Sequence, residues 1–123
     1  MSSADASDAL PQFLLLFREP KTDALPPSPE ELQALLAEWT AWADHVGAEG
    51  KYHSGNPLEE SGAVLRGPAG EHVTDGPFIE AKEFLGGYFL ISAADLNDAI
   101  TIARGCPGLR DGMSVEVRPI LAH

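Results

Sequence analysis

Asp75, Glu80 and Lys82 stand close together in the segment TDGPFIEAKEFLGGYFL, which covers Thr74–Leu90. An aspartate before Gly-Pro commonly accepts backbone amides of its own turn, which would make Asp75 structural. Aimed into a cleft and partly desolvated, the same carboxylate could instead serve as a general base. In an extended segment Glu80 and Lys82 share a face, so that the lysine could bind an anionic substrate group. The alternative is a solvated charge cluster, which adds little stability.

Two further side chains could complete such a site. His53 lies on a predicted strand, from which it could meet Asp75 across a sheet. Tyr88 could place its hydroxyl in a pocket, although a core aromatic residue with a hydrated tip is the commoner case. A zinc site would need three or four converging ligands, and no such spacing is visible, so we expect no metal and no other cofactor.

The clearest element that would position these residues is a helix over Ser28–Val46. Ser28 can cap the free amides, a proline follows at the first helical position, and Glu31 completes a capping box. Trp39 is expected to pack in the core, and Trp42 to lie at the edge of the apolar stripe near a pocket rim. The stripe follows from apolar residues at steps of three and four, which are Leu32, Leu35, Leu36, Trp39, Ala43 and Val46.

The remaining elements follow from short apolar runs and turn signals. The run Gln12–Glu19 is bounded by prolines and predicts a central strand. Downstream, AVLR and HVTD flank a glycine-rich turn and indicate a hairpin. The last three predictions are a strand over Gly86–Ser92, a helix over Asp95–Arg104 capped by Asp95 or Ser92, and an alternating strand over Met113–Leu121.

This order of elements predicts an α+β fold with a ferredoxin-like antiparallel sheet and two helices on one face. The first and last strands are too apolar to leave the other face of the sheet half exposed. We therefore expect a homodimer in which sheet packs against sheet.

Charge and composition limit the classes of partner. The chain has 19 acidic and 8 basic residues and a net charge of −11, which disfavours binding to nucleic acid or to an anionic membrane. The single cysteine, Cys106, cannot form an internal disulfide, which fits a cytoplasmic protein. The length of 123 residues predicts one domain over 12–123, after a flexible acidic tail over 1–11.

Two long motifs, VTDGPFIEAKEFLGGYFLI and GCPGLRDGMSVEVRPI, resemble the YCII-related (YciI-like) family and specifically its DGPF branch. The resemblance covers about Gln12–Ile120 and implies a dimeric α/β-barrel with a ferredoxin-like fold. In YciI-like members, a histidine on the first helix and a downstream aspartate are proposed as an acid–base pair. The matching helix position here falls near Trp39, and the only histidine of this helix is His45.

Two functions remain as hypotheses. The first is an enzyme with the lyase or dehydrochlorinase-like chemistry that the resemblance implies. A cleft near Asp75, between sheet and first helix, would bind a small aromatic or anionic molecule, and Asp75 would move a proton. The second is a non-catalytic ligand-binding or regulatory homodimer, which the resemblance links to sigma-factor transcription control. In the first case the substrate-binding residues would be Glu80, Lys82, His53, Trp39 and Tyr88.

Overall fold

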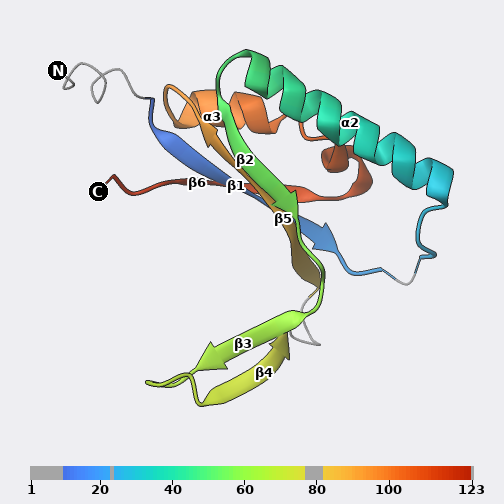
Figure 1. The fold of residues 1–123 in the computed structure, drawn as a ribbon, viewed down its shortest axis with the longest axis vertical. Helices are drawn as coiled ribbons and strands as arrows, with labels where there is room; N and C mark the ends of the chain where they lie inside the picture. Colours follow the sequence, from blue (N-terminus) through green and yellow to red (C-terminus); the bar gives the residue numbers. More distant parts are fainter. Residues whose placement is uncertain (1–9, 23, 77–81, 123) are drawn as a thin grey trace.

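The structure, a computed structural model, describes residues 10–22, 24–76 and 82–122. Its elements follow the predicted order of strand, helix, strands, helix and strand (Figure 1). Of the predicted tail, only residues 10 and 11 lie within the described part. The elements are β1 (Gln12–Pro20), α2 (Pro29–Ala48), β2 (Tyr52–Pro57), β3 (Gly62–Arg66), β4 (His72–Gly76), β5 (Glu83–Ser92), α3 (Leu96–Ala103), the 3₁₀ helix η1 (Pro107–Asp111) and β6 (Ser114–Pro119).

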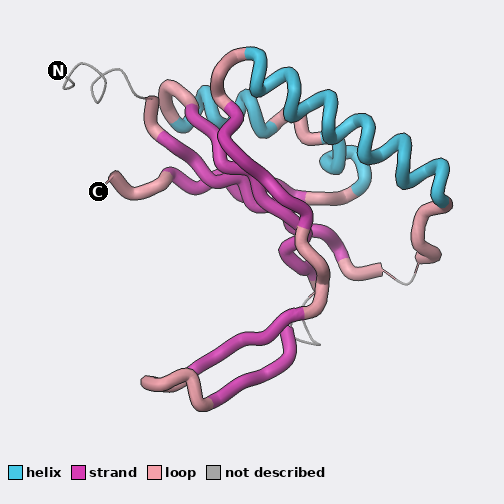
Figure 2. The backbone as a smooth tube through the Cα atoms, viewed as in Figure 1, coloured by secondary structure: helices cyan, strands magenta, loops and turns pink. Residues whose placement is uncertain are grey.

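Four strands form one antiparallel sheet in the order β2-β5-β1-β6. β1 pairs with both β5 and β6, so the prediction of a central first strand is confirmed. Both helices lie on the same side of this sheet (Figures 1 and 2). The arrangement is α+β, and its strand order agrees with a ferredoxin-like fold.

The long helix α2 begins where the sequence signals place it. The Ser28 side chain accepts a hydrogen bond from the Glu31 amide at 3.1 Å, and the Glu31 carboxylate accepts one from the Ser28 amide at 3.0 Å. This reciprocal pair satisfies two of the amides that a helix leaves free at its start. Within the described residues, no helix is both long and apolar enough to cross a membrane.

The hydrophobic core fills the space between the helices and the sheet. β1 contributes Phe13, Leu15 and Phe17, which alternate with less buried residues and therefore all point toward the helices. β5 contributes Phe89 and Ile91 in register with them. The helices close the core from above with Trp42, Val46, Ala99, Ile102 and Ala103.

The face of the sheet opposite the helices carries both apolar and charged side chains. Leu14 pairs with Leu90 and Leu16 pairs with Tyr88, and these four side chains are half-buried in the single chain. They form an apolar strip that points away from both helices, since successive side chains of a strand alternate between faces. This strip is called the outer leucine strip below.

Charged side chains lie beside the outer leucine strip. Arg18 donates to the Glu116 carboxylate at 3.0 Å, and Arg118 donates to its other oxygen at 3.1 Å. Glu116 therefore forms ion pairs with both arginines. The two guanidinium groups hold the pKa of Glu116 below its usual value through these hydrogen bonds.

β3 and β4 form the predicted hairpin, and they form a two-stranded sheet of their own. In Figure 1 the hairpin projects away from the four-stranded sheet and from both helices. Its turn uses Gly67 and Gly70, both with positive φ (97° and 68°), a conformation that glycine adopts without a steric penalty. Leu65 and Val73 pair across the hairpin and are 62% and 61% exposed.

Candidate functional site

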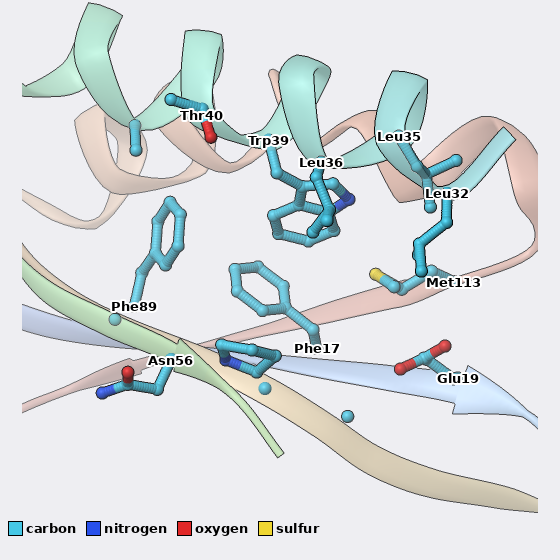
Figure 3. A pocket seen from close by; sticks show the side chains of 15 residues that line it. Phe17, Glu19, Leu32, Leu35, Leu36, Trp39, Thr40, Asn56, Phe89 and Met113 are labelled. Carbon is cyan, nitrogen blue, oxygen red and sulfur yellow. The ribbon is translucent and has the colours of Figure 1, made fainter. Parts of the chain in front are cut away.

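A pocket of about 420 Å³ lies between the first half of α2 and the sheet (Figure 3). Volumes of this size are typical of sites for small molecules. Leu32, Leu35 and Leu36 form the wall on the helix side and remain 45%, 38% and 55% exposed. They belong to the predicted apolar stripe, but this part of the stripe faces the open pocket. The stripe is buried only further along the helix, at Trp42 and Val46.

Aromatic rings form the inner end of the pocket. Phe17 contacts Trp39 edge to face, with ring centroids 4.9 Å apart, and contacts Phe89 in the same way at 5.2 Å. Trp42 stacks on Phe89 behind them, with a centroid distance of 4.7 Å. The rings fix one another, so this end of the pocket is rigid and preformed.

The tryptophans differ from the prediction at Trp42. Trp42 is 7% exposed and belongs to the core, not to a pocket rim, whereas the half-buried Trp39 both packs against the core and lines the pocket. Both predictions rested on the position of each residue along the apolar stripe. The stripe is wide enough to hold both rings, and the sheet below covers only its later part.

Glycines on the sheet side of the pocket leave space that side chains would otherwise fill. The pairing of β1 with β5 shifts between Phe17, which is opposite Gly87, and Arg18, which is opposite Leu85. Gly86 is therefore the extra residue of a β-bulge. A Cβ atom at Gly87 would lie 3.0 Å from the Asn56 carbonyl oxygen and 3.6 Å from the Phe17 ring. The two glycines therefore allow the bulge and the close approach of β2 and Phe17.

Glu19 is the one ionisable side chain among the described residues that line the pocket. It follows Phe13, Leu15 and Phe17 at the two-residue step of β1 and so points to the helix side. Its side chain lies against Gly86, where an added Cβ atom would overlap the carboxylate. Burial, and secondarily the negative charge of Glu60, raise the pKa of Glu19 above its ordinary value.

Few other polar groups face the pocket. Thr40 contributes a hydroxyl from α2. Asn56 lines the floor, but its side chain points to the other face of the sheet, as Figure 3 shows. There it donates a hydrogen bond to the Tyr88 hydroxyl at 3.1 Å. The pocket is therefore apolar and aromatic, with a carboxylate at its end near Leu32 and Met113 (Figure 3).

Asp75 lies on β4, opposite Ala63, where its side chain is exposed. It belongs to the projecting hairpin and does not line the pocket. Lys82 is exposed just before β5, and its carbonyl oxygen accepts a hydrogen bond from the Lys21 amide at 2.9 Å. Glu80 falls outside the described residues. The described part of the predicted acid–base cluster therefore lies apart from the pocket.

The other predicted binding residues are distributed over both faces of the sheet. His53 on β2 lies 2.5 Å from Ser92 through its Nε2 atom, and it is in a different sheet from Asp75. Tyr88 points to the outer face, where its hydroxyl meets Asn56. Of the predicted binding residues that the structure describes, Trp39 alone lines the pocket.

Glu19 was not predicted from the sequence as a pocket residue. Its signal was present, because Phe13, Leu15 and Phe17 mark one face of a strand and Glu19 occupies the next position on that face. A carboxylate that continues an apolar face is unusual enough to be a candidate.

Cys106 and the potential metal ligands give no second candidate site among the described residues. Cys106 is 5% exposed, and its thiol lies 3.8 Å from the Met113 sulfur. Burial raises the pKa of this thiol, which makes it a poor nucleophile. Across residues 10–22, 24–76 and 82–122, no three His, Cys, Asp or Glu side chains are grouped as a metal site requires.

Comparison with known proteins identifies the family. A family model of the YCII-related domain matches residues 12–122, which is nearly the whole chain. An uncharacterized protein of Rhizobium meliloti (strain 1021) is 44% identical over 63 residues. That match covers 50% of this chain and 51% of the relative, so the chain spans about half the length of the curated relative it matches. The chain belongs to the YCII-related family, as its DGPF-containing motifs predicted.

Proposed function

We propose that the protein binds a small, largely aromatic molecule in the pocket between α2 and the sheet. The observation that carries this proposal is the combination of a preformed volume of about 420 Å³ with half-exposed leucines and a fixed aromatic end. Apolar side chains at a concave surface lose contact with water when a ligand enters, which stabilises the complex by about 25 cal/mol per Å² buried.

The position of the three leucines supports this proposal. Leu32, Leu35 and Leu36 occupy successive turns on one side of α2 and leave an apolar patch on the surface. Single exposed apolar residues are common, but grouped ones around a concavity usually mark a binding site. A flat aromatic compound would fit between this patch and the rings of Phe17 and Trp39.

Acid–base chemistry in this pocket would fall to Glu19 and not to Asp75. A carboxylate with a raised pKa in an apolar setting is the type of group that enzymes use as a general acid. Asp75 is exposed on the hairpin, outside the pocket. The placement of Glu19 supports a lyase-like reaction only for a substrate that presents its reacting atom at that end of the pocket.

Ligand binding can be measured directly, because Trp39 lines the pocket. We expect indole, 2-naphthol or 2-phenylethanol to change the tryptophan fluorescence and to raise the melting temperature in a saturable manner. Leu36→Gln should weaken binding several-fold. Leu25→Gln is the matched control, because Leu25 is 91% exposed and lies outside the pocket. The proposal fails if no compound binds wild type, or if both variants bind equally well.

A second proposal concerns assembly, and the outer leucine strip supports it. Leu14, Leu16 and Leu90 leave an apolar strip on a sheet face that neither helix covers. A two-fold contact of this face with its copy would bury the strip and form the dimeric α/β-barrel, the setting for a regulatory homodimer.

Light scattering coupled to size exclusion tests this assembly. We expect twice the chain mass of 13.1 kDa for wild type and the single mass for Leu16→Glu. Leu65→Glu, on the exposed hairpin, is the matched control and should remain dimeric. A monomeric wild-type protein at tens of micromolar would contradict the proposal.

A further inference from the structure

We propose that the pocket selects a lipophilic amine, with its apolar body against the α2 leucines and Trp39 and its ammonium group at the Glu19 carboxylate. This inference rests on the proposed function and names the chemical class of the ligand. It also departs from the sequence-based expectation of an anionic substrate.

The first argument is the state of the Glu19 carboxylate. Among the described residues, no hydrogen bond and no ion pair to this carboxylate is formed. It nevertheless lines an apolar pocket, where a charged group loses hydration. A ligand ammonium would supply the missing counter-charge and hydrogen-bond donors, and charge-assisted hydrogen bonds of this kind are the stronger ones.

The second argument comes from the charges near the pocket. Among the residues that the structure describes, no lysine, arginine or histidine lines it. The negative charge of Glu60 acts on Glu19 strongly enough to raise the pKa of Glu19 further. Two negative charges at this end oppose the entry of a third, so a carboxylate or phosphate ligand is disfavoured there. The net charge of −11 draws cations toward the protein in general.

The third argument is the aromatic end of the pocket. Phe17 and Trp39 line the pocket and contact each other edge to face, with ring centroids 4.9 Å apart and planes at 77°. Glu19 lies at the other end, near Leu32 and Met113 (Figure 3). A ligand that places its ammonium group at Glu19 therefore rests its hydrocarbon part against these rings and the leucines, where apolar surface is buried.

The alternative is a neutral ligand that accepts a hydrogen bond from protonated Glu19. It predicts a different order of affinities. A neutral alcohol would then bind as tightly as the amine of the same shape, and removal of the negative charge would leave both affinities unchanged. Three compounds with a common phenyl group separate the two cases: 2-phenylethylamine, 2-phenylethanol and 3-phenylpropionate.

The experiment measures the affinity of these three compounds by calorimetry at pH 7 for wild type and variants. We expect the amine to bind wild type about tenfold more tightly than the alcohol, as one charge-assisted hydrogen bond warrants, and the carboxylate to bind weakest. Glu19→Gln should remove the preference for the amine and leave the alcohol unaffected. Asp44→Asn, which removes one negative charge from the exposed side of α2, is the matched control and should leave all three affinities unchanged.

Gly86→Ala is a second variant that retains the charge of Glu19. The added methyl group would lie 2.7 Å from the Glu19 Cδ atom, so the carboxylate must move from its place. We expect it to reduce the preference for the amine without abolishing binding of the alcohol. This variant keeps the inference testable if Glu19→Gln does not fold.

Each outcome has one meaning. If none of the three compounds binds wild type, both the proposed function and this inference fail. If the alcohol or the carboxylate binds wild type as tightly as the amine, or if Glu19→Gln keeps the wild-type preference, the inference fails and the pocket proposal stands. A preference for the amine that is lost in Glu19→Gln and kept in Asp44→Asn supports it.

Discussion

Replacement of Gly55 by alanine is expected to destabilise the protein, because the pocket floor has no room for a methyl group. A Cβ atom at Gly55 would overlap the Phe89 ring and lie 2.8 Å from the Tyr88 carbonyl oxygen. The ring cannot move aside, since Phe89 is 8% exposed and stacks on Trp42. The carbonyl group belongs to β5, which pairs with β2 at this point.

The expected cost combines two effects. Extra atoms in a well-packed region typically destabilise by about 1–3 kcal/mol. Alanine also restricts the unfolded chain, which stabilises the folded state by about 0.4–1 kcal/mol where the backbone conformation suits it. The net loss is therefore about 1–2 kcal/mol, or roughly 3–10 °C in melting temperature for a domain of this size.

Urea denaturation followed by tryptophan fluorescence measures this loss. The matched control is Gly62→Ala, because a Cβ atom at Gly62 would meet nothing within 4 Å. We expect the control to unfold at the wild-type urea concentration or slightly above it. If Gly55→Ala unfolds at the same urea concentration as Gly62→Ala, the Phe89 ring can move aside and the packing at the pocket floor is not tight.

Three further predictions concern charge and capping. Burial raises the folded-state pKa of Glu19, so its ionisation lowers stability as pH rises through that pKa. Glu19→Gln should thus be more stable than wild type at pH 7 and lose this advantage below about pH 4 in urea titrations. The Ala94 amide, followed by Lys51, lowers the pKa of Asp98. Asp98→Asn should destabilise at pH 7, and the difference should shrink as thermal unfolding is repeated toward about pH 2. Ser28→Ala removes the cap of α2 and should cost about 1 kcal/mol, measured by circular dichroism on heating.

Local signals predicted most of the elements. The capping box at Ser28 and the alternation in Met113–Leu121 each depend on a few neighbouring residues, so the sequence alone was sufficient to place α2 and β6. The apolar run Gln12–Glu19 was sufficient to indicate a central first strand. The short helix η1 was not predicted, because Pro107 and Gly108 are typical of an irregular turn.

The site depended on tertiary relations that no local pattern contains. The DGPF turn indicated a functional Asp75, but the direction of the hairpin decides whether that carboxylate meets a pocket, and the turn does not set that direction. The leucines of α2 indicated a buried stripe, but the extent of the sheet beneath the helix decides which of them are covered. Glu19 was not predicted either, although the period of β1 is sufficient to put it on the same face as Phe17.

The hairpin of β3 and β4 has a consequence for how this chain can vary in length. It leaves the four-stranded sheet after β2 and returns at β5, two strands that are direct neighbours. The Leu58 amide donates a hydrogen bond to the Gly86 carbonyl at 2.9 Å, so the pairing of β2 with β5 continues to the point where the chain leaves the sheet. Residues 59–76 form no ladder with the four-stranded sheet, so a change in the length of this part of the chain leaves that sheet intact, and each doubling of a loop costs only about 0.6 kcal/mol. Insertions and deletions among relatives should therefore concentrate in this segment, while β1, β5 and the glycines of the pocket floor keep their spacing.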